Sequence, residues 1–109
     1  MKVALDNTKR RERLSIEIRD KYAQLMLDMI KPYVQTERET WPTQIAEANA
    51  YLADPAAEVP LITTLATNRG VALADLVSWI KANEGLYRQA VGTLLGMQQA
   101  ELDALYNPV

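Results

Sequence analysis

The stretch from Ala72 to Leu105 limits the fold of this chain more than any other part of the sequence, because it contains no proline and keeps one helical phase. Its apolar residues recur at the spacing of a helix face: Leu73, Val77, Ile80, Tyr87, Val91, Leu94, Leu102 and Leu105. A continuous helix of this length is roughly 50 Å long. We therefore expect a long C-terminal helix over about residues 72–105. A helix of this length extends beyond a compact domain of 109 residues.

The glycines of this stretch leave two predictions open. Gly85 and Gly92 each cost about 1 kcal/mol relative to alanine inside a helix. In one prediction the helix kinks or breaks near Gly85 or Gly96. In the other it stays whole, and the small residues Gly92, Gly96, Ala100 and Ala104, spaced four apart, form a ridge along which another helix approaches closely.

A second amphipathic pattern predicts a basic N-terminal helix over about residues 8–31. Its main stripe has spacings of four, four, three and four: Leu14, Ile18, Tyr22, Leu25 and Met29. Further apolar residues widen this stripe: Ile16, Met26, Leu27 and Ile30. A widened stripe is typical of a helix that contacts more than one neighbour, within the fold or across an oligomer interface. Pro32 ends or kinks the helix, because proline disfavours helical geometry in the residue before it.

Central helices are predicted within residues 40–69 by the prolines of this segment. Thr40 or Trp41 begins the first of them, since proline at position 42 is tolerated in a first helical turn. Asp54, followed by another proline, ends it. Pro60 then opens a short further helix.

The clearest turn signal follows that short helix. Gly70 suits the left-handed conformation with which many helices end, and Val71 is placed to fold back on the last turn. One turn of helix separates Gln44 from Glu47, and we expect both side chains to bind backbone groups at the start of the helix that Pro60 opens. For Glu47 a structural role is favoured over a catalytic one, because no base, nucleophile or metal ligand accompanies it.

These patterns predict an all-α protein, a single domain over residues 1–109 with three to five helices in a small bundle. The residues expected to form its core and turns are Trp41, Pro42, Gln44, Glu47, Asp54, Pro60, Leu65, Gly70, Val71, Leu76 and Trp79. Aromatic residues fall on or beside apolar stripes, so core packing is the expected role for them.

Composition excludes several kinds of site. The chain has no cysteine and no histidine, which rules out disulfides, thiolate metal sites, the usual zinc ligand and the usual general base near neutral pH. We therefore predict no catalytic, cofactor-binding or metal-binding residues and no enzymatic activity. No apolar run approaches the roughly 20 residues that cross a bilayer, and no signal peptide is evident. We expect a soluble protein made in the cytosol, without membrane contact.

Charge is unevenly distributed along the chain, although the net charge is only −2. Residues 1–38 carry nine Lys and Arg against six Asp and Glu, whereas residues 39–109 carry three against eight. The basic residues at the N-terminal end alternate with acids, which is typical of a solvated helix face. Association of the basic end with the acidic end of a neighbouring subunit stays open as an alternative.

A helix-turn-helix regulator is the alternative function, because the small, turn and core residues of that motif have the spacing found here in Leu65-Ala66, Gly70-Val71, Leu76 and Trp79. The helix that would enter DNA begins Ala-Leu-Ala-Asp, and no arginine, lysine, asparagine or glutamine precedes Lys81 in it. Those are the side chains that read base edges, so we expect no nucleic-acid binding.

The segment from Thr40 to Val71 resembles a family of small proteins and domains of tailed bacteriophages and prophages. The resemblance is carried by Trp41, Pro42, Gln44, Glu47, Ala48, Asp54, Pro60, Leu61, Arg69 and Gly70, and it continues through Leu76 and Gly96-Met97-Gln98-Gln99. Family members tend to have a basic residue where Met97 stands, so any contact made by that side chain does not carry over.

The resemblance implies a structural or assembly protein of the phage tail or tail fibre, without catalytic residues. Its partners would be a tail or tail-fibre protein and further copies of itself, in the cytoplasm of the bacterial host during assembly or in the virion tail. The residues expected at the interface are Leu14, Ile18, Tyr22, Leu25, Met29, Gly92, Gly96 and Ala100. Virion component and assembly chaperone both stay open.

Overall fold

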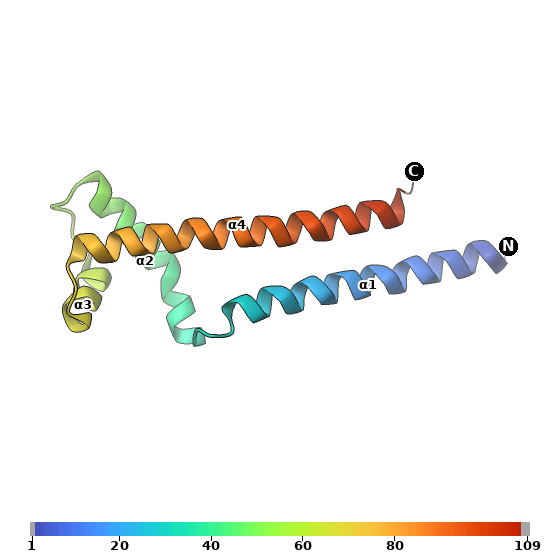
Figure 1. Cartoon of the computed structure of the whole chain (residues 1–109), viewed down its shortest axis with the longest axis horizontal. Coiled ribbons are helices and arrows are strands. Elements are labelled where there is room, and N and C mark those ends of the chain that lie inside the picture. The colour runs from blue at the N-terminus through green and yellow to red at the C-terminus, as the bar shows by residue number, and fades with distance from the viewer. Residues whose placement is uncertain (1, 108–109) are drawn as a thin grey trace. The chain divides into compact units, whose positions relative to one another are not determined.

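The computed structural model describes residues 2–107, and the side chains from residue 7 onward. Four helices follow one another along the chain: α1 (Lys2–Ile30), α2 (Gln35–Ala53), α3 (Pro60–Arg69) and α4 (Leu73–Tyr106). No strand occurs in this described part (Figure 1). The all-α fold with a long C-terminal helix is therefore confirmed.

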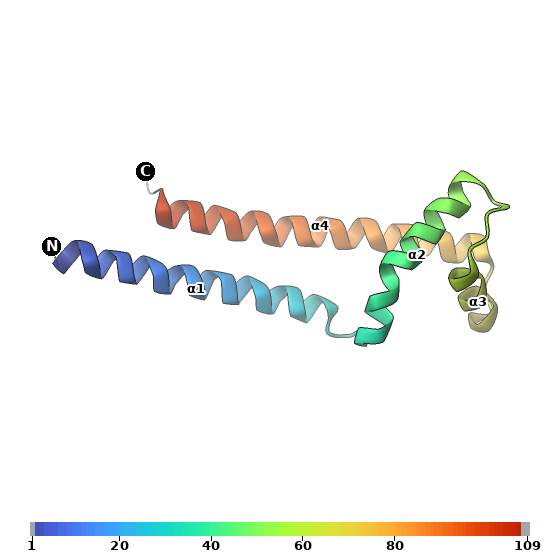
Figure 2. The same ribbon diagram turned by 180° about the vertical axis from the view of Figure 1, so that it is seen from behind.

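The chain divides into two compact units. The first consists of residues 1–32 and 89–109, and the second of residues 33–88. In the first unit, α1 and the C-terminal part of α4 run side by side in opposite directions, as Figures 1 and 2 show from opposite sides. We call this antiparallel pair the hairpin.

The second unit has the apolar core. Its buried residues come from α2, from the connection before α3, from α3 and from the first part of α4: Ala48, Val59, Ile62, Ala66, Leu76, Val77 and Ile80. Ile62 and Val77 are the largest side chains that are completely enclosed. Ile45, Tyr51, Leu65, Val71 and Leu73 pack around this core. Three helical segments thus enclose one small core.

The predicted left-handed helix end is present at Gly70, where φ is 76° and ψ is 34°. The N–H groups of Gly70 and Val71 both donate to the carbonyl oxygen of Ala66, at 2.9 and 3.0 Å. These bonds satisfy carbonyl groups that the end of a helix leaves without partners. The chain turns sharply here, and α4 begins at Leu73.

Two predicted boundaries were wrong. The second helix begins at Gln35, several residues before Thr40, and Pro42 lies inside it. Val34 has extended geometry before the first turn, and Glu37 in that turn suits the positive end of the helix dipole. The first helix begins at Lys2, earlier than residue 8.

The long C-terminal helix neither breaks at Gly85 nor at Gly96, since α4 is one continuous helix. A Cβ atom added at either position would meet no neighbouring atom within 4 Å. These glycines therefore do not permit a close approach within the described chain, and the structure offers no packing reason for them.

Candidate functional site

On each helix of the hairpin, residues that are buried or half-buried recur at spacings of three and four, and we call these residues the seam. In α4 these are Val91, Leu94, Gln98, Glu101 and Leu105, and in α1 they are Ser15, Ile18, Tyr22, Met26 and Met29. This spacing keeps one face of each helix toward the other, as in a coiled coil. Only Ser15 and Tyr22 are buried, and the remaining seam residues are half-buried. Two helices alone do not enclose a core.

A polar contact lies at the centre of the hairpin. Lys21 Nζ donates to Glu101 Oε1 at 2.8 Å. The hydrogen-bonding interactions with Lys21 and with Tyr22 lower the pKa of Glu101, and the interaction with Glu101 raises the pKa of both Lys21 and Tyr22. Glu101 Oε2 is buried and accepts no well-aligned hydrogen bond from the described residues. This contact fixes which segment of α1 lies against α4.

The structure places most of the predicted α1 interface inside the hairpin. Tyr22 is buried, Leu14, Ile18 and Met29 are half-buried, and only Leu25 is exposed. The stripe of α1 that was predicted to contact another molecule is thus largely covered by α4 of the same chain.

The small residues of α4 are in a different situation. Gly92, Gly96 and Ala100 are exposed. A Cβ atom at Gly92 or Gly96 would contact nothing within 4 Å. The ridge is present, but no described element packs on it.

Large apolar side chains remain exposed on the hairpin. Their exposed fractions are Ile16 59%, Leu27 55%, Met97 51%, Tyr106 46%, Leu25 42% and Leu95 39%. In the sequence, Ile16 and Leu27 only widened the first stripe, and Leu95 and Tyr106 belonged to no pattern. The one available signal was their position, since Ile16, Leu27, Leu95 and Tyr106 each follow a seam residue directly.

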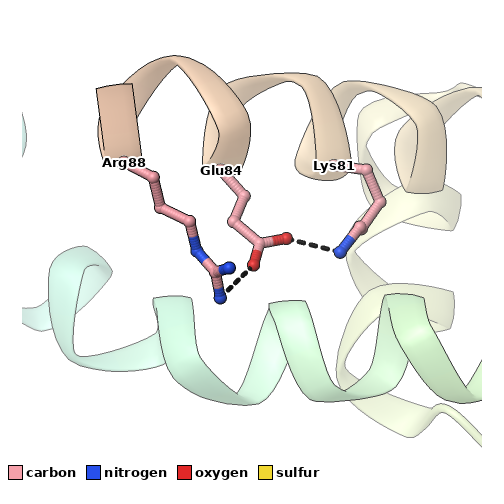
Figure 3. A network of polar contacts seen from close by, with 3 residues as sticks. All are labelled: Lys81, Glu84 and Arg88. Carbon is pink, nitrogen blue, oxygen red and sulfur yellow. Dashed lines mark hydrogen bonds and ion pairs between the residues drawn. The ribbon is translucent and has the colours of Figure 1, made fainter. Parts of the chain in front are cut away.

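The second unit contains a buried carboxylate. Glu84 lies 8% exposed on α4, where Lys81 Nζ donates to Oε2 at 2.6 Å and Arg88 Nη2 pairs with Oε1 at 2.7 Å. The hydrogen bond from Lys81 lowers the pKa of Glu84, and the charge of Arg88 lowers it further. Figure 3 shows the three side chains pointing from α4 toward α2. Each carboxylate oxygen has a cationic partner, so the arrangement is a closed structural pairing.

The predicted helix cap at Pro60 is made by Glu47 alone. Glu47 Oε1 accepts a hydrogen bond from the Ile62 N–H at 3.2 Å. Gln44 instead donates to Thr40 Oγ1 at 2.9 Å, within its own helix. The expectation is thus confirmed for Glu47 and wrong for Gln44.

Other predicted core and turn residues have diverse positions. Leu76 is buried, whereas Trp41, Leu65 and Val71 are half-buried. Pro42 and Pro60 are exposed, and so is Asp54, whose Oδ1 accepts from the Ala56 N–H at 3.0 Å.

The two tryptophans have different environments. Trp41 makes edge contacts with Tyr33 and Tyr87, with ring centroids 5.2 and 6.0 Å apart. Trp79 was expected in the core and is exposed, because Leu76, Val77 and Ile80 occupy the inward face of this part of α4. Its ring instead carries the guanidinium of Arg69, 5.2 Å from the centroid.

The helix that follows the Gly70 turn begins with acidic and apolar side chains. The exposed positions just before and at the start of α4 are Ala72, Ala74, Asp75, Ser78 and Trp79. The nearby cations are engaged, Arg69 on the Trp79 ring and Lys81 on Glu84. An acidic and apolar helix start lacks the donors that recognise bases.

Among the described residues, no three acidic side chains lie close enough to hold a metal ion. None of the described helices combines the length and the apolar character that crossing a bilayer requires. No protein-family model matches the sequence, and searches of curated proteins and of solved structures found no match either.

Proposed function

We propose that this chain is a non-enzymatic structural or assembly protein of a bacteriophage tail, which acts by binding other proteins through its helices. The observation that carries the proposal is the open hairpin, whose large apolar side chains Ile16, Leu27, Leu95 and Tyr106 remain exposed. Contiguous exposed apolar surface on a small protein marks a site of protein contact. The tail setting comes from the family resemblance of residues 40–71.

The chemistry of the described residues supports contact in preference to catalysis. The carboxylates of Glu84 and Glu101 each form a salt bridge with a lysine side chain. The cations near the Gly70 turn also have partners within the chain. We therefore favour a protein-binding function over a DNA-binding one.

The partner we propose is the tail or tail-fibre protein of the same phage, met in the cytoplasm of the bacterial host during assembly. Apolar contacts of this kind resist salt, whereas binding to DNA phosphates weakens steeply as salt rises. The salt dependence of binding thus separates the two functions.

The test is co-expression of the affinity-tagged chain with the tail-fibre protein encoded in the same phage genome. We expect co-purification that survives washing at high salt and is lost when Ile16 and Leu27 are both replaced by lysine. Replacement of Lys9 and Arg10 by glutamine is the matched control and leaves co-purification intact. Failure to capture any tail protein, combined with a salt-sensitive shift of duplex DNA, would overturn the proposal in favour of a regulator.

A further inference from the structure

We infer that the hairpin binds the hairpin of a second copy of this chain, in an antiparallel two-fold arrangement centred on Ala23. This inference rests on the proposed function and names one partner of the exposed surface, a second copy that exchanges with the tail protein on the same residues. The surface consists of Ile16, Ala23, Leu27 and Ile30 from α1 together with Leu95, Leu102 and Tyr106 from α4, and we call it the Ile16 face.

These residues share one side of the hairpin because of their place relative to the seam. Each follows a seam residue directly, as Ile16 follows Ser15 and Leu95 follows Leu94. In an antiparallel helix pair, residues rotated in the same sense from both seams lie on the same side. Lys21, which precedes the seam residue Tyr22, bonds to Glu101 on the opposite side. The salt bridge and the Ile16 face therefore do not compete for space.

The spacing of the α1 residues is self-complementary. Ile16, Ala23 and Ile30 follow one another at intervals of seven, with a small residue between two large ones. An isologous two-fold contact places the same patch on both subunits. With Ala23 at the axis, Ile16 meets Ile30 of the partner subunit on each side, while the two alanines allow the helices to approach closely.

Charge complementarity supports a second copy as the occupant. Glu17 and Lys31 directly follow Ile16 and Ile30, both are exposed, and neither belongs to an ion pair among the described residues. In the antiparallel register, Glu17 flanks Lys31 of the partner subunit, and the symmetry repeats this pair. One chain thus carries both halves of the contact.

The seam of the hairpin gives a further reason for a second layer of helices. Its residues are only half-buried, and a helix pair gains a closed core when another pair covers it, as in a four-helix bundle. Covering the Ile16 face buries its apolar side chains and the adjacent edge of the seam.

The first experiment is light scattering after gel filtration on the full chain and two variants. We expect a dimer for the natural chain and a monomer of unchanged helicity for the double variant Ile16→Lys and Leu27→Lys. Met97→Lys is the matched control, since Met97 is equally exposed and precedes the seam residue Gln98; it remains dimeric. A natural chain that stays monomeric at high concentration would overturn the inference.

The second experiment tests the register by exchanging charges. Glu17→Lys alone and Lys31→Glu alone each place like charges together and weaken the dimer, whereas the combined variant restores it. The chain has no cysteine, so Ala23→Cys provides a clean cross-link. We expect rapid disulfide-linked dimers from Ala23→Cys and none from Met97→Cys.

The outcomes also separate this inference from the proposed function. A monomer that still captures the tail-fibre protein through Ile16 and Leu27 overturns the inference and leaves the function standing. A dimer with the predicted charge behaviour that captures no tail protein overturns the function and leaves the inference standing.

Discussion

The Glu47 carboxylate accepts a hydrogen bond from the Ile62 N–H, 3.2 Å from Oε1, and so joins α2 to the first turn of α3. Neither Val59 nor Pro60 supplies a side-chain cap to that turn. A carboxylate at a helix N-terminus also suits the helix dipole. The contact therefore holds the first turn of α3 against α2, next to the core residue Ile62.

Replacing Glu47 by alanine is expected to lower the free energy of unfolding by about 1 kcal/mol, as the loss of a helix cap commonly does. Chemical denaturation followed by circular dichroism measures the change. Glu58→Ala, an exposed acid in the neighbouring connection, serves as the control and stays within about 0.5 kcal/mol of the natural chain. Equal losses in both variants would mean that the Glu47 contact has no stabilising effect.

Alanine has opposite effects at two glycines. Gly70→Ala destabilises by about 1 kcal/mol, because φ at this position is +76° and alanine tolerates it poorly. Gly85→Ala stabilises by about 1 kcal/mol, because the position is helical and open. Thermal unfolding of the two variants checks the signs, and a loss at Gly85 would reveal a contact with another molecule.

The ion pairs of Glu84 make the stability of the folded chain depend on pH. The pKa of Glu84 is lowered in the folded chain, so its contribution is fully present above the ordinary value of 4.5 and is lost as the pH falls through the lowered value. We expect Glu84→Gln to unfold at a lower temperature than the natural chain at neutral pH. The difference shrinks in acid, and melting curves across this range measure it. A constant difference at all pH values would contradict the role of the ionised carboxylate.

Alkaline conditions weaken the hairpin by a separate route. The pKa values of Tyr22 and Lys21 are raised above 10.0 and 10.5 by the interaction with Glu101. Their contributions are therefore present below those ordinary values and are lost as the pH rises through the raised ones. Absorbance of the tyrosinate ion should show the late titration of Tyr22, which Tyr22→Phe removes. In Glu101→Gln the same tyrosine is expected to titrate earlier, and an unchanged titration would contradict the assignment.

The boundaries of the helices were predictable where a nearby glycine or proline sets them. Gly70 and Pro60 act within a single turn, and the structure has the helix boundaries that they predict. The start of α2 was not predictable from Pro42, because a proline inside a helix loses only one hydrogen bond and α2 tolerates it.

The candidate site was less predictable, for a reason that lies in the periodicity itself. The stripe of Leu14, Ile18 and Tyr22 has the same spacing whether its partner is α4 or another chain. The carboxylate of Glu101 against Lys21 decides between them, and residues 80 positions apart leave no local trace of their pairing. Trp79 was misplaced because helical spacing alone does not tell which edge of an apolar stripe faces the core.

The chain passes between the two units twice, once in the connection after α1 and once near Arg88 and Gln89, inside the continuous helix α4. A protease needs an extended, locally unfolded segment, which a hydrogen-bonded helix does not supply. The connection from Lys31 to Val34 is the only non-helical link between α1 and the second unit. Cleavage there releases α1 as a peptide, but the other helix of the hairpin stays joined to the second unit through α4, so a single cut does not separate the two units.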